Sequence, residues 1–126
     1  MKLTRLIRDR RGTTAIEFAL VAPVFFALVF GIIEGGLLLW TQLGLQHGAQ
    51  VAARCASINP TACGTTSDIQ NYAAQQAYGL SISPSTFTFV ATTCGNQVSA
   101  SYTFAFLSSY FGSPSMALNA RACYPK

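Results

Sequence analysis

The chain has little charge and few of the residues that bind nucleic acids. Its 126 residues include only four acidic and eight basic side chains. Five of the eight basic residues fall in the first twelve positions, so that only Arg54, Arg121 and Lys126 remain for the rest of the chain. A DNA- or RNA-binding domain needs Lys and Arg spread over its folded surface. We therefore exclude nucleic acid as a partner.

Residues for catalysis and metal binding are equally scarce. After residue 40 the sequence offers one carboxylate, Asp68, and one histidine, His47. No nucleophile, base and orienting group can be placed together from such a set. A zinc site would need a second histidine or a Cys-x-x-Cys pair. We expect a protein that is not an enzyme and holds no cofactor or metal, with His47 solvated.

The charge that is present lies at the N-terminus, where Lys2 and four arginines stand against Asp9 for a net charge of +4. The remaining residues carry three charges of each sign. Residues 18–40 are almost wholly apolar, and a helix of this length spans about 35 Å, enough to cross a bilayer core of about 30 Å. The sequence predicts one transmembrane helix with a cytoplasmic N-terminus. Trp40 is then an interfacial anchor.

An ordinary secretory signal peptide is the alternative interpretation of a basic start followed by an apolar run. The apolar run is about twice as long as the usual core of such a signal. In addition, Glu17 stands between the basic residues and the apolar run, and no small-x-small cleavage site closely follows Trp40. A released, secreted binding domain is therefore the least favoured of the functions considered.

The residues around the start of the apolar run resemble the N-terminal segment of TadE-like pilus assembly proteins. These are the minor pilins, or pseudopilins, of the Tad (Flp) branch of type IV pilus systems. The resemblance covers roughly residues 10–52 and rests on Gly12, Glu17-Phe18, Ala19-Leu20, Pro23, Gly31 and Ile33-Glu34-x-Gly36.

The resemblance implies cleavage by a prepilin peptidase between Gly12 and Thr13, which leaves Glu17 as the fifth residue of the mature chain. Glu17 and Phe18 are then the assembly residues, and the Glu17 carboxylate pairs with the new Thr13 ammonium group of a neighbouring subunit. An unpaired carboxylate within the bilayer costs about 2.5 to 3.5 kcal/mol on insertion scales, which favours such a pair. The alternative is an acid that merely rests in the headgroup region.

The function implied is that of a minor pilin or pseudopilin in Tad pilus assembly. Its partners are the prepilin peptidase, other pilin and pseudopilin subunits, the assembly machinery and membrane lipid. The chain would be a single-pass inner-membrane protein with a periplasmic head, or part of the extracellular pilus. An uncleaved, membrane-anchored periplasmic scaffold of the secretion machine is the alternative.

Several residues of the apolar run bear on helix packing. Gly31 and Gly35 match the small-xxx-small pattern that lets helices approach closely. Glu34 lies beside them, either within the membrane or near its surface, depending on helix tilt. Pro23 lacks an N–H group and is expected to kink the helix.

Helical periodicity continues past the membrane and predicts one helix from about Thr14 to Ser57, ended by Asn59-Pro60. Beyond the membrane, one face of this helix is expected to carry Gly44, Gly48, Val51, Cys55 and Ile58 at three- and four-residue steps. The predicted organisation is a leader at 1–12, an N-terminal helix at 13–57 and a small head domain at 58–126.

The head begins with a predicted capping box, Ser67 to Gln70, which starts a short helix from about Asp68 to Tyr78 with Gly79 at its C-terminal cap. From Thr86 the hydrophobic period becomes two, which predicts strands.

We expect a hairpin with Gly95-Asn96 as its turn, placing Phe89 opposite Tyr102 and Phe87 opposite Phe104. A third strand, about Ser115 to Cys123, should bury Met116, Leu118 and Ala120. The fold class is α+β, with a three-stranded antiparallel sheet.

All four cysteines follow the membrane segment, which favours disulfides in an oxidising compartment. Three pairings are possible. We prefer Cys55–Cys63, at the end of the long helix, and Cys94–Cys123, between the hairpin turn and the chain end. Each bridge would add about 2 to 4 kcal/mol to a small core.

Overall fold

A computed structural model describes residues 12–107, 112 and 115–126, so that most of the predicted leader lies outside the described residues. The predicted α+β class is confirmed: a long apolar helix is followed by one short helix and a three-stranded antiparallel sheet. The elements are α2 (Thr13–Ile58), α3 (Thr66–Gln75), the 3-10 helix η2 (Pro84–Thr86), β1 (Phe87–Thr92), β2 (Gly95–Phe104) and β3 (Met116–Tyr124).

Helix α2 begins one residue before and ends one residue after the predicted bounds. The last helical turn closes with a hydrogen bond from Asn59 N to Cys55 O (2.8 Å), and Pro60 prevents continuation. The chain divides into two compact units, Met1–Gly35 and Gly36–Lys126. Helix α2 contributes to both, and each is described separately below.

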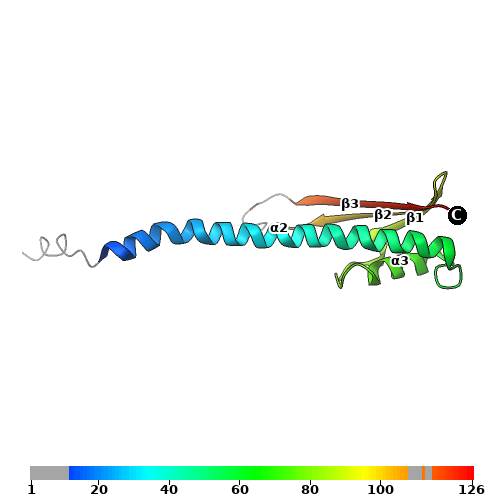
Figure 1. Ribbon diagram of the computed structural model, residues 1–126, viewed down its shortest axis with the longest axis horizontal. Helices are drawn as coiled ribbons and strands as arrows, with labels where there is room; N and C mark the ends of the chain where they lie inside the picture. The colour runs from blue at the N-terminus through cyan, green and yellow to red at the C-terminus, as the bar shows by residue number, and fades with distance from the viewer. Residues whose placement is uncertain (1–11, 108–111, 113–114) are drawn as a thin grey trace, which may run out of the picture. The chain divides into compact units, whose positions relative to one another are not determined.

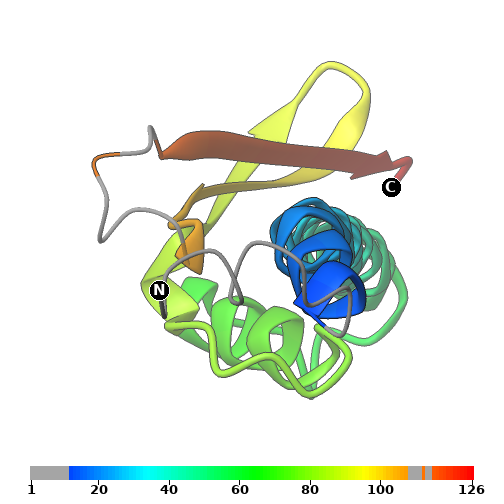
Figure 2. The same ribbon diagram turned by 90° about the vertical axis from the view of Figure 1, so that its left-hand side faces the viewer.

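In the C-terminal unit, α2 and α3 cover one face of the sheet and the core lies between these layers (Figures 1 and 2). Leu45, Phe87 and Val98 are its largest fully buried side chains. Close approach depends on small residues of α2. A Cβ atom at Gly48 would lie 2.6 Å from Ala73 O and 3.2 Å from the Phe87 ring.

The face of α2 predicted from helical periodicity is only partly buried. Gly44, Gly48 and Cys55 are buried, but Ile58 is 60% exposed and Val51 is half-buried. The buried side of α2 also includes Leu45, Ala49, Ala52 and Ala53. Because both α3 and the sheet pack against α2, the buried stripe is wider than a single line of apolar residues.

Helix α3 starts earlier than predicted and uses a different cap. Thr65 Oγ1 accepts a hydrogen bond from Asp68 N (3.2 Å), and Asp68 Oδ2 accepts one from Thr65 N (3.2 Å), forming the capping box. Gln70, predicted to close a box with Ser67, instead donates from Nε2 to Phe87 O (2.7 Å). The helix ends at Gln75 with Gln76 as its cap, so Gly79 lies in the turn beyond.

The hairpin between β1 and β2 exists, but its predicted register is wrong. Thr92 pairs with Gly95, which makes Thr93-Cys94 the turn, and Phe87 and Phe89 pair with Ala100 and Val98. The shift is by four residues, an even number, so the aromatic residues stay on the same face of the sheet.

Gly95 is needed for a close approach rather than for the turn. It has φ +125°, and a Cβ atom there would meet Tyr124 O and lie 2.7 Å from Pro125 Cα.

The strand order is β1-β2-β3, so β1 and β3 form the edges. Leu118 and Ala120 of β3 are buried as predicted. Met116 is instead 47% exposed, because it is the first residue of the strand, at the rim of the core.

Glutamine side chains of the helices donate hydrogen bonds to backbone carbonyls of both edge strands. Gln42 Nε2 donates to Asn119 O (2.9 Å) and Gln46 Nε2 donates to Arg121 O (3.1 Å), both on β3. Gln70 does the same for Phe87 O at the start of β1. These contacts join α2 and α3 to the rims of the sheet.

Candidate functional site

The predicted cleavage position coincides with the start of α2. Gly12 is exposed and immediately precedes Thr13, the first residue of the helix. A Cβ atom at Gly12 would meet nothing within 4 Å. Packing within the described chain therefore does not require glycine at this position.

The first described unit exposes almost its whole apolar surface. Phe18 is 71% exposed, and Glu17 beside it is exposed too. Helix α2 is long and apolar enough to cross a membrane. Such a surface needs lipid or other helices around it. The large apolar side chains that this unit exposes are Ile16, Phe18, Leu20, Val21, Val24, Phe25, Phe26, Leu28, Phe30, Ile32 and Ile33.

The helix brings Glu17 and the glycines of the small-xxx-small pattern onto one face, whereas Phe18 and Glu34 lie about 100° away from that face. Glu17 and Gly35 are 18 residues apart, which is five full turns of about 3.6 residues, and Gly31 is one turn before Gly35. A Cβ atom at Gly31 or at Gly35 would meet nothing within 4 Å. Glu34, by contrast, is half-buried and does form an interaction.

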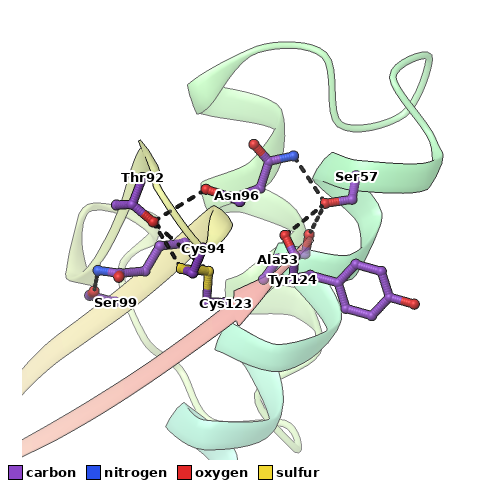
Figure 3. The surroundings of a disulfide bond; sticks show 10 residues. Ala53, Ser57, Thr92, Cys94, Asn96, Ser99, Cys123 and Tyr124 are labelled. Atoms are coloured by element: carbon purple, nitrogen blue, oxygen red, sulfur yellow. Dashed lines mark hydrogen bonds between the residues drawn. A yellow bond between two sulfur atoms is a disulfide. The ribbon is translucent and has the colours of Figure 1, made fainter. Parts of the chain in front are cut away.

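Both disulfides join the pairs expected from the sequence. Cys55–Cys63 links the end of α2 to the following loop with a Cα–Cα distance of 5.8 Å. Cys94–Cys123 links the hairpin turn to β3 with a Cα–Cα distance of 6.4 Å (Figure 3). Thr92 Oγ1 lies 2.9 Å from Cys94 Sγ at this second bridge.

A polar network beside the second disulfide ties α2 to the sheet. Asn96, which is buried, donates from Nδ2 to Ser57 Oγ (3.0 Å), as Figure 3 shows. The Ser57 hydroxyl in turn lies 3.2 Å from Ala53 O and 3.4 Å from Tyr124 O. The last turns of α2 are thus held to β2 and to the end of β3.

The prediction that the His47 side chain is solvated is wrong. His47 is half-buried, its Nδ1 lies 2.9 Å from Gln76 O, and its ring stacks on Tyr78 at 4.4 Å between centroids. Tyr78 also contacts Trp40 at 5.8 Å. The sequence carries no local signal for this aromatic cluster, since it depends on where the turn after α3 lies. Among the described residues no group of three His, Cys, Asp or Glu side chains could hold a metal ion.

Comparison with known proteins finds a family match for the N-terminal part of the chain. No curated protein and no solved structure matches this chain. A family model described as TadE-like protein matches residues 12–54, from the glycine before α2 almost to the end of that helix. Residues 12–54 of this chain are therefore a TadE-like domain, as the sequence predicts.

Proposed function

We propose that this chain is a minor pilin or pseudopilin that enters a Tad pilus through α2 after prepilin peptidase cleavage between Gly12 and Thr13. The observation that supports this most is the TadE-like match, which begins at Gly12, directly before the first residue of α2. The family implies a role in Tad pilus assembly. The cleavage of this chain, its contacts with other subunits and its partners are our proposal.

Membrane insertion before assembly accounts for the exposed apolar surface of residues 16–33. The basic residues before residue 12 favour a cytoplasmic N-terminus. The two disulfides are typical of an oxidising compartment and support a periplasmic location of the C-terminal unit. Prepilin peptidase would then act on the cytoplasmic side of the membrane.

Assembly proceeds through the face of α2 that carries Glu17, Gly31 and Gly35. Cleavage turns Thr13 N into an ammonium group, and Glu17 of an adjacent subunit neutralises it in a low-dielectric setting. The open space at the two glycines lets another helix approach closely. The pilin helices that surround the chain in the filament would replace lipid.

The experiment that tests this function is intact-mass measurement or N-terminal sequencing of the protein from its native membrane. A minor pilin loses residues 1–12, an uncleaved anchor loses nothing, and a released domain loses the whole apolar run. Full-length protein alone in cells with an active prepilin peptidase would contradict the proposal.

Gly12→Leu sharpens the test. The precursor of this variant should accumulate, because a bulky side chain next to the scissile bond hinders entry of the extended backbone into the peptidase. Gly36→Leu is the matched control, since Gly36 also has open space around its Cα within the described chain. This control should mature normally, whereas normal maturation of Gly12→Leu would refute the assigned site.

A further inference from the structure

One end of the C-terminal unit carries exposed aromatic and apolar side chains from α2, from β3 and from the turn after α3. Trp40 on α2 is 52% exposed, Tyr78 after α3 is 49% exposed and Met116 at the start of β3 is 47% exposed. Leu43 on α2 is exposed as well. We call these four residues the collar.

The turn after α3 holds Tyr78 in an unusual conformation. Tyr78 has φ +50° and Gly79 has φ +72°, so two successive residues are left-handed. A non-glycine residue in this region is strained, because its Cβ atom crowds the following carbonyl oxygen. The strain is offset where the Tyr78 ring contacts Trp40 and stacks on His47, and where His47 Nδ1 bonds to Gln76 O. The turn thereby fixes Tyr78 beside Trp40.

Strand β3 brings Met116 to the same end. Its carbonyls meet α2 in ascending order, Asn119 with Gln42 and Arg121 with Gln46, so the strand runs in the same direction as the helix. Met116 is three residues before Asn119, about 10 Å towards the N-terminal side of α2. This places Met116 near the level of Gly36, about 6 Å nearer the N-terminus of α2 than Trp40.

Two further aromatic rings belong to this end. Phe104 pairs with Met116 across the sheet, and its ring packs edge-on against Phe106 at 5.2 Å.

Charged groups of the C-terminal unit lie away from the collar. Arg54 follows Trp40 by 14 residues, about 21 Å along α2. Asp68 is in the first turn of α3, at the end opposite Tyr78, and Lys126 follows Tyr124, whose carbonyl lies near Ser57. Arg121 is level with Gln46. Within the described part of this unit, His47 is the ionisable side chain that touches the collar, whereas Glu34 belongs to the other unit.

We propose that the collar rests in the headgroup region of the lipid bilayer, so that the head is seated on the membrane by Tyr78 and Met116 as well as by α2. This inference rests on the proposed membrane insertion of α2. Trp and Tyr rings, with an apolar body and one polar group, favour the membrane–water interface. Trp40 is the last residue of the apolar stretch 18–40 and Leu43 follows it within one turn of α2, which argues for lipid as the occupant of the collar.

The single tryptophan of the chain makes this testable by fluorescence. In the full-length protein, Trp40→Phe is combined with Tyr78→Trp, with Met116→Trp, or with Val90→Trp as control. Val90 is 53% exposed, as much as the collar, but lies on β1 outside it. Each protein is reconstituted into phosphatidylcholine vesicles whose lipids carry a quencher either on the headgroup or at the end of the acyl chain.

Tryptophan at positions 78 and 116 should lose more emission with the headgroup quencher than with the acyl-chain quencher, and should be shielded from acrylamide in the water. Tryptophan at the control position 90 should show the reverse. Its emission should be quenched by acrylamide and left unchanged by both lipid-attached quenchers. Acrylamide quenching at both 78 and 116 in protein that floats with the vesicles would overturn the collar and leave membrane insertion standing. Protein that does not float would contradict both.

Discussion

Glu17 is the residue on which the assembly proposal depends most directly. Glu17→Gln keeps the shape of the side chain and loses the charge, so it should reduce co-purification of the mature protein with sheared pili nearly as much as Glu17→Ala. Both variants should still insert and largely be cleaved, because Glu17 lies beyond the scissile bond.

Glu17→Asp retains a carboxylate and is the control, with incorporation closer to that of the unaltered protein. The measurement compares strains that express each variant at equal level. If the Gln variant assembles as well as the unaltered protein, Glu17 serves packing or peptidase recognition and forms no ion pair.

Gly48 makes a second prediction at the residue scale. In an exposed helix, Gly→Ala stabilises by about 1 kcal/mol. At Gly48 the new methyl group would meet Ala73 O at 2.6 Å and the Phe87 ring at 3.2 Å, so Gly48→Ala should destabilise by about 1 to 3 kcal/mol. Urea unfolding of the detergent-solubilised protein measures this. Gly36→Ala, with open space around it, should leave the midpoint unchanged or raise it.

Among the elements, α3 offers a comparison of two candidate caps. Thr65 is bonded to Asp68 in the structure, whereas Ser67 already lies inside the helix. Thr65→Ala should therefore lower the free energy of unfolding by about 1 kcal/mol, as loss of an N-cap does. Ser67→Ala should change it by a few tenths at most, since alanine favours the helix interior. Equal effects of the two variants in denaturant unfolding would contradict this assignment.

Elements whose signal lies in the local sequence were predicted well. Helix α2 follows from one long apolar run and from Asn59-Pro60, and the sheet follows from the alternation of apolar residues. The hairpin turn was misplaced because Gly95 satisfies a close approach of Tyr124, which is a tertiary requirement. The α3 cap was misplaced because two overlapping Ser/Thr-x-x-Asp/Gln patterns occur within six residues.

The site shows the same limit. The shared face of Glu17, Gly31 and Gly35 could be predicted from the sequence, because a helix converts spacing into a common face, while the roles of these residues stay predictions. The contacts of Tyr78 with Trp40 and His47 could not, since a turn between α3 and β1 brings residues 30 to 40 positions apart together.

For the molecule as a whole, the two disulfides should contribute unequally. Cys94–Cys123 closes a sequence separation of 29 residues and Cys55–Cys63 one of 8. Chain entropy alone makes the longer closure worth about 1 kcal/mol more. The double variant Cys94→Ser/Cys123→Ser should thus unfold at lower urea concentration than Cys55→Ser/Cys63→Ser. The opposite order would show that local packing around the shorter bridge outweighs loop closure.

The hydrogen bonds from glutamine side chains to the edge strands matter where many head domains are crowded together. In a polymer of such subunits, heads stand beside one another at very high local concentration, where uncapped edge strands could join into cross-β aggregates. Gln42 and Gln46 already occupy the outward carbonyls of Asn119 and Arg121 on β3. Helix α2 thus covers part of the β3 edge, so that under the proposed assembly fewer carbonyls of this strand are left to pair with a strand of a neighbouring head.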